Sequence, residues 1–166
     1  MKRFCFALAL LGAGLLPPAV AQATPASSFA EAVDLCLRFG ADPWFAQDRF
    51  EEAGWRSYED PDFGSLAFKS PDGAVIALPP TSDSFPMWCS VMSGSVSFVK
   101  GMAAAENALL ASGILIQREI RDNCPVYHGT GGQELRIFSE GNDDLCNDPE
   151  TALVHVVTFS NPLSGQ

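Results

Sequence analysis

The sequence GSLAFKSPDGAVIAL runs from Gly64 to Leu78 and consists of two apolar segments joined by a short polar turn. In both segments apolar residues alternate with small or polar ones, a pattern typical of β-strands. In the turn, Pro71 presets its own φ angle and Gly73 tolerates a tight backbone geometry. The stretch therefore predicts a β-hairpin with strands at 64–70 and 74–78.

A helix is expected upstream, over Phe29–Phe39. Ser28 and Glu31 have the spacing of a capping box, in which each side chain satisfies a free amide of the first turn. Apolar residues then recur at helical spacing, and Cys36 falls on that stripe, so its side chain should face the core. Gly40 is expected to end the helix in a left-handed conformation.

A second helix is expected over Pro43–Ala53. Asp42 can cap it, Pro43 suits the first helical position, and Gly54 can end it. The same region supplies many large rings. Most should pack in the core, whereas any ring left exposed would mark a partner surface; the rings are Trp44, Phe45, Phe50, Trp55 and Tyr58.

One more helix and four more strands are expected after the hairpin. The helix covers Phe98–Ser112, capped by Ser95 or Ser97 and closed by Gly113. The strands cover Met87–Met92, Ile114–Ile120, Gln133–Ser139 and Ala152–Phe159. The last strand is apolar on both faces, which predicts a central strand covered on both sides.

This order of elements predicts an α+β fold: an antiparallel sheet of about five to six strands, with two N-terminal helices and one mid-chain helix packed on it. The order ααβββαβββ loosely resembles that of profilin-like and PAS-like sheets. The resemblance is one of topology alone, and such scaffolds host many unrelated functions.

The first residues predict a secretory signal peptide over residues 1–23. Lys2 and Arg3 are followed by the apolar run Phe4–Leu16 and by small residues suited to cleavage. The apolar run is too short to cross a bilayer as a helix, and no later segment is long enough. Residues 24–166 are then expected to form a single exported domain, periplasmic or secreted, without a membrane span.

Export determines how the cysteines are interpreted. Cys5 would leave with the signal, and it lies too early for lipid attachment, just as Cys36 lies too late. The remaining four cysteines are an even set in an oxidising compartment, which predicts two disulfides. The alternative is a zinc site, but the four lack the close pairs that zinc sites use. Three disulfide pairings are possible, and we favour Cys36 with Cys89 and Cys124 with Cys146.

The chain is strongly acidic. Its 10 basic residues oppose 20 acidic ones, and removal of Lys2 and Arg3 leaves 8 against 20, a net charge of −12. Such a charge repels nucleic acid and anionic lipid. It favours a solvated surface or a basic partner, so we expect an unidentified protein or small-molecule partner and no nucleic acid.

His128 and Tyr127 are weak catalytic candidates. His128 follows Tyr127 and precedes the glycine-rich run Gly129–Gly132, where a backbone can approach a ligand closely, although a surface hairpin loop explains the same residues. His155 lies in the apolar last strand and is interpreted as a core histidine with one hydrogen bond.

Acidic side chains crowd the loop around Cys146, and Asp143, Asp144 and Asp148 are weak calcium candidates. The spacing of an EF-hand loop is absent, so an acidic turn tied by a disulfide is favoured. No cofactor is expected.

The sequence thus favours a small exported, disulfide-stabilised binding module without catalysis. One alternative is a small exported hydrolase or transferase that uses the His128 loop. Another is a structural accessory of an envelope complex.

Overall fold

The computed structural model describes residues 23–62, 64–82, 86–113, 116–130, 132–139, 146 and 150–159. The predicted signal segment and its apolar run therefore lie outside the described residues. The elements are α1 (Pro25–Phe39), α2 (Pro43–Glu52), β1 (Arg56–Asp60), β2 (Ser65–Lys69), β3 (Ile76–Leu78), β4 (Met87–Ser93), α3 (Phe98–Ser112), β5 (Ile116–Arg121), β6 (Cys124–Gly129), β7 (Gln133–Phe138) and β8 (Ala152–Thr158). None of the described helices is long and apolar enough to cross a membrane.

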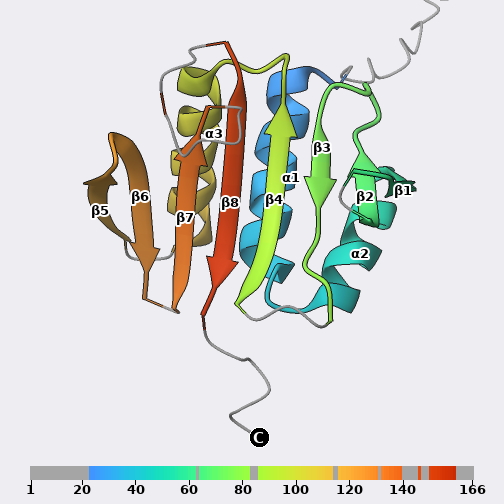
Figure 1. Cartoon of the computed structure of the whole chain (residues 1–166), viewed down its shortest axis with the longest axis horizontal. Helices are drawn as coiled ribbons and strands as arrows, with labels where there is room; N and C mark the ends of the chain where they lie inside the picture. The colour runs from blue at the N-terminus through green and yellow to red at the C-terminus, as the bar shows by residue number, and fades with distance from the viewer. Residues whose placement is uncertain are drawn as a thin grey trace, which may run out of the picture.

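The eight strands form one antiparallel sheet in the order β1-β2-β3-β4-β8-β7-β6-β5. Each half of the chain supplies helical structure followed by four consecutive strands, and β4 and β8 join the halves. Helix α1 packs on β4 and β8, and α3 packs on β8 and β7, so both lie behind the same face of the sheet (Figure 1). The predicted α+β class is confirmed, but the described residues contain eight strands instead of five to six, and their order differs from the expectation.

The two strands that the sequence analysis missed are β1 and β6. Strand β1 has the sequence RSYED, and its largely exposed residues give no apolar alternation. Strand β6 contains Pro125, which lies beyond Val126, the last β6 residue paired with β7, so its missing amide breaks no ladder bond there. The sequence does indicate the turn before β6. Asp122 and Asn123 both have positive φ, as a two-residue hairpin turn requires, and Asp and Asn are residue types that such turns favour.

The hairpin predicted from the Gly64–Leu78 stretch is confirmed. Phe68 pairs with Ala77, and the amide of Ser70 donates to the carbonyl of Val75 at 3.0 Å. Gly73 has a φ of 76°, which its lack of a Cβ allows. The Ser28 hydroxyl donates to Asp72 at 3.2 Å, so the turn is tied to α1.

Helix α1 begins earlier than predicted. Thr24 is its N-cap and forms a capping box with Ser27, so the assignment of Ser28 and Glu31 as the box is wrong. Glu31 instead accepts a 2.9 Å hydrogen bond from the indole of Trp55. Gly40 has a φ of −66° and is not left-handed. A Cβ on Gly40 would lie 2.4 Å from the Cys36 carbonyl oxygen and 3.0 Å from the Cys89 Cβ, so close packing explains this glycine.

The bounds of α3 match the prediction, and Gly113 closes it with a φ of 68°. Ser97 is the N-cap, but its side chain makes no capping hydrogen bond, so the predicted side-chain cap is wrong. Helix α2 is capped as predicted: Asp42 accepts from the amides of Trp44 at 3.0 Å and Phe45 at 3.2 Å.

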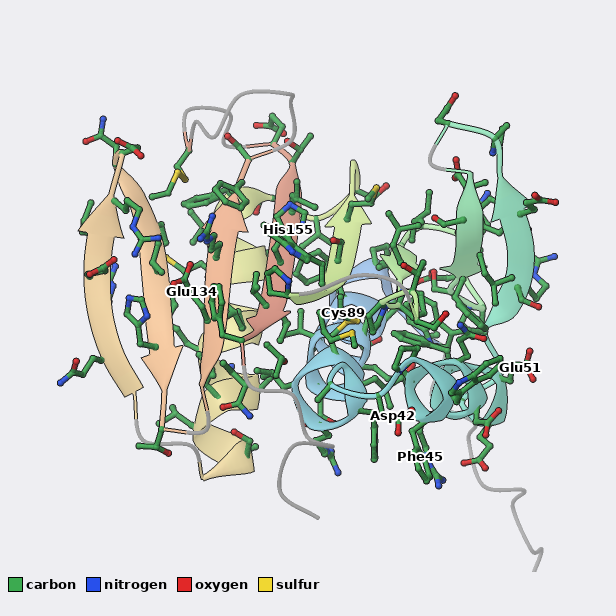
Figure 2. All side chains as sticks on the ribbon, turned by 60° about the horizontal axis from the view of Figure 1, so that its bottom comes forward. Asp42, Phe45, Glu51, Cys89, Glu134 and His155 are labelled. Carbon is green, nitrogen blue, oxygen red and sulfur yellow. A yellow bond between two sulfur atoms is a disulfide. The ribbon has the colours of Figure 1, made fainter. Side chains whose placement is uncertain are left out.

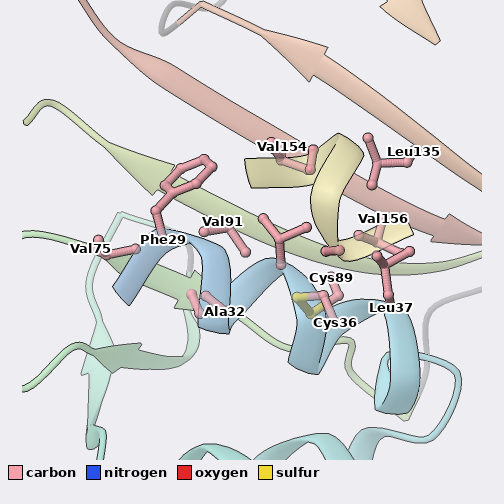
Figure 3. Close-up of a cluster of buried hydrophobic side chains, with 14 of the residues drawn as sticks. Phe29, Ala32, Cys36, Leu37, Val75, Cys89, Val91, Leu135, Val154 and Val156 are labelled. Atoms are coloured by element: carbon pink, nitrogen blue, oxygen red, sulfur yellow. A yellow bond between two sulfur atoms is a disulfide. The ribbon is translucent and has the colours of Figure 1, made fainter. Parts of the chain in front are cut away.

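The core lies between the helices and the sheet (Figure 3). Phe29, Val91 and Val154 are fully buried there, and Cys36 of α1 is bonded to Cys89 of β4 in their midst. The second disulfide joins Cys124 to Cys146. Both predicted pairings are confirmed, and Cα–Cα distances of 5.5 and 5.4 Å are normal for disulfides.

Strand β8 is central, as predicted, but the two helices that contact it cover only one of its faces. Val154 and Val156 join the core cluster on that face. His155, which alternates with them, therefore belongs to the other face. We call that face of β4, β5, β6, β7 and β8 the open face, since no described helix packs on it.

Candidate functional site

The open face carries a histidine and a serine in direct contact. Ser90 of β4 and His155 of β8 are paired across the strands, and the Ser90 Oγ lies 2.6 Å from the His155 Nδ1. The rings of Trp88 and Phe138 flank the imidazole at 5.6 and 5.4 Å, both edge to face. The predicted hydrogen bond of His155 is thus confirmed, but its assignment to the core is wrong, because His155 is half-buried on the open face and outside the core cluster (Figure 2).

His128 lies in strand β6 and not in a loop, which corrects the hairpin-loop interpretation. Its Nε2 is 3.2 Å from Glu119 of β5, and its Nδ1 is 3.5 Å from Glu134 of β7. The hydrogen bond from His128, followed by that from Arg121, lowers the pKa of the Glu119 carboxyl. His128 therefore has two carboxylates within reach, either of which can orient the imidazole, as the orienting group of a catalytic base does.

Glu134 contacts His128 and two arginines. Its side chain is only 8 % exposed, and it accepts from Arg121 at 3.3 Å and from Arg136. The Arg136 guanidinium also lies 5.8 Å from the centroid of the Trp88 ring. Glu119 and Glu134 together balance the charges of Arg121 and Arg136, as in a structural network that fixes side chains on a sheet face.

Tyr127 is separated from His128. Neighbours in a strand point to opposite faces, and Tyr127 is buried on the helix side, where its hydroxyl donates to Glu106 of α3. Burial, reinforced by Glu106, raises the pKa of Tyr127 far above its usual range. The two candidates therefore cannot act together on one substrate, and a catalytic role for His128 alone stays a prediction.

The remaining candidates show no ligand site among the residues that the structure describes. Gly132 has a φ of 77° and its amide donates to the Gly129 carbonyl at 3.3 Å, so the glycines serve the β6–β7 turn. The calcium candidates Asp143, Asp144 and Asp148 lie outside the described residues. Within the part of the chain that the structure describes, no group of three or more His, Cys, Asp or Glu side chains is placed to hold a metal ion.

Of the five large rings between residues 44 and 58, Tyr58 is half-buried and the other four divide into two groups, so the prediction that most of them lie in the core is wrong. Phe50 and Trp55 are buried, with ring centroids 5.2 Å apart, whereas Trp44 is 71 % exposed and Phe45 is 54 % exposed. Figure 2 shows Phe45 on α2 pointing away from the sheet. Residue type alone does not separate the buried rings from the exposed ones, but the helical spacing of the buried Ala46 and Phe50 identifies the opposite side of α2 as the outer one.

The exposed side of α2 is continuous along the helix. Its residues fall at i, i+1, i+4, i+7 and i+8, which is one face of a helix, and all are exposed. We call this set the α2 docking face; it consists of Trp44, Phe45, Asp48, Glu51 and Glu52. Two rings occupy its first turn, and carboxylates occupy the rest.

Comparison with known proteins finds no match: no family model, no curated protein and no solved structure is significantly similar to the chain. The loose topological resemblance to profilin-like and PAS-like sheets therefore gains no support.

Proposed function

We propose that the chain is an exported, non-catalytic binding module that docks a partner protein through the α2 docking face. The observation that carries the proposal is the exposure of Trp44 and Phe45, at 71 % and 54 %, beside rings of the same segment that are buried. Single exposed apolar residues are common, but two adjacent large rings form the kind of anchor that dominates protein interfaces.

The backbone that carries the two rings is held in place before any partner binds. Asp42 accepts from the amides of Trp44 and Phe45, which fixes the first turn of α2. On the inner side of the helix Phe50 stacks on Phe68 with ring centroids 5.3 Å apart. A rigid anchor loses less conformational entropy on binding than a flexible one, so this arrangement favours affinity.

The carboxylates of the same face define the chemistry of the partner. Asp48 and Glu51 make no ion pair within the described residues, whereas Glu52 pairs with Arg49. A complementary partner is a protein with an apolar pocket rimmed by lysine or arginine. A second copy of this acidic chain, or an anionic lipid surface, would meet like charges and is disfavoured.

Export is supported by the two disulfides. Such bonds persist in oxidising compartments and are rare in the reducing cytosol. The same two disulfides fix the frame of this small domain covalently, which suits a binding module that works outside the cytosol.

The test is site-specific photo-cross-linking in the producing organism. A benzophenone amino acid replaces Phe45 in one full-length variant and Leu110, 72 % exposed on α3, in a matched control. We expect a protein adduct from position 45 that is absent from position 110, and whose yield falls at high salt because the rim contacts are ionic. Equal adducts at both positions, an adduct with a second copy, a lipid adduct or no adduct would each refute the proposal.

A further inference from the structure

We infer that a second site, on strands β1 and β2, binds a small anionic ligand that carries a carboxylate or phosphate group. The site is an open pocket of about 360 Å³ lined by Arg56, Ser57, Tyr58 and Lys69. This volume is within the range of small-molecule sites, roughly 300–1,000 Å³. It lies at the β1 edge of the sheet, on different elements from the α2 docking face, and is independent of the function proposed above.

The pocket brings together two cations that have no partner. Arg56 and Lys69 are directly opposite in the β1–β2 pair. Neither side chain forms an ion pair or a hydrogen bond within the described residues. Four other arginines of the same domain do have carboxylate partners: Arg38, Arg49, Arg121 and Arg136.

Like charges directly opposite across an antiparallel pair destabilise the sheet. The chain is acidic, with 20 acidic residues against 10 basic ones, so carboxylates that could neutralise these cations are plentiful elsewhere in it. A pair of uncompensated cations is therefore best explained by a ligand that supplies the missing negative charge.

The donors define the ligand. The Arg56 guanidinium offers a planar fork that fits a carboxylate or phosphate, and the Lys69 ammonium offers a point charge. The Tyr58 hydroxyl already donates to Asp60 at 3.1 Å, so its ring is left to line the wall. Ser57 adds an exposed hydroxyl. Two cations around one pocket suit a group with one or two negative charges.

The test is a titration of the oxidised, signal-processed protein with inorganic phosphate and, separately, with citrate, followed by ¹⁵N amide shifts. We expect saturable shifts at Arg56, Ser57, Tyr58 and Lys69 with at least one probe. Arg56→Gln and Lys69→Gln should each weaken that binding about tenfold or more, the cost of one charge-assisted hydrogen bond. Lys100→Gln, which removes an exposed cation on α3 that has no ion pair within the described part of the chain, should change it less than about twofold.

Stability provides the second readout. Without ligand, Arg56→Gln or Lys69→Gln should raise the melting temperature because it removes the like-charge contact, whereas Lys100→Gln should leave it unchanged. Absence of saturable shifts with both probes would overturn the inference. So would equal weakening by Lys100→Gln, or a lowered melting temperature in both pocket variants, since the cations would then have a structural role.

Discussion

Replacement of both Cys36 and Cys89 by alanine should remove the larger part of the stability that the disulfides supply. The bond closes a loop of 53 residues, against 22 for Cys124–Cys146. On the loop-entropy model these values correspond to about 4.2 and about 3.4 kcal/mol at 25 °C. Whole domains have only about 5–15 kcal/mol, so the Cys36→Ala/Cys89→Ala variant should be marginal.

Burial should widen the difference in stability loss between the two disulfides. Cys36 and Cys89 are 1 % and 0 % exposed in the core cluster, so their loss also removes packing around Val91 and Leu37. The assay is equilibrium urea unfolding of wild type, Cys36→Ala/Cys89→Ala and Cys124→Ala/Cys146→Ala, followed by far-UV circular dichroism. The reasoning fails if the first double variant loses less than about 1 kcal/mol, or if it is more stable than the second.

Three further variants test the packing, the cap and a buried hydroxyl. Gly101→Ala places a Cβ 2.5 Å from the Ala152 Cβ, so overpacking should outweigh the gain in helix propensity. The variant should lose about 1–2 kcal/mol of stability in urea unfolding. A stabilised variant would contradict the α3–β8 contact. Asp42→Ala should cost about 1 kcal/mol by loss of the α2 cap, against less than about 0.5 for the exposed Asp48→Ala, and equal losses would refute the cap. Burial and Glu106 raise the pKa of Tyr127. The folded state therefore keeps a proton that the unfolded state loses above a pH of about 10. The free energy of unfolding should fall as the pH rises beyond that value. Tyr127→Phe should make this alkaline fall shallower, and an unchanged slope in unfolding experiments across that pH range would count against the Glu106 contact.

Much of the fold could be predicted because local signals agreed with the final packing. Asp42-Pro43 and Gly113 mark helix ends that the structure confirms, and Gly73 marks the hairpin turn. Strand β1 was missed because it lies at the sheet edge and has a largely exposed, polar sequence. Strand β6 was missed because Pro125 and Gly129 resemble loop residues, whereas tertiary pairing with β5 and β7 makes them a strand.

The candidate sites were less predictable, since they depend on which residues the sheet order brings together. Nothing local to Ser90 and His155 indicates that β4 and β8, far apart in sequence, are neighbours. The same holds for Arg56 and Lys69, whose cross-strand contact required β1 to be recognised first. Exposure of Trp44 and Phe45 follows from the side of α2 that Phe50 occupies, and that side is decided by packing on β2.

The central claim is that α2 anchors a partner protein. It is tested most directly by calorimetry, which measures the affinity of the partner identified by cross-linking for wild type and for Trp44→Ala. Burial of the exposed part of this ring should contribute about 2–4 kcal/mol. Trp44→Ala should therefore weaken binding roughly 30- to 1,000-fold, while Leu110→Ala on α3 leaves it unchanged. Equal affinities of wild type and Trp44→Ala, in a variant that folds normally, would contradict the account.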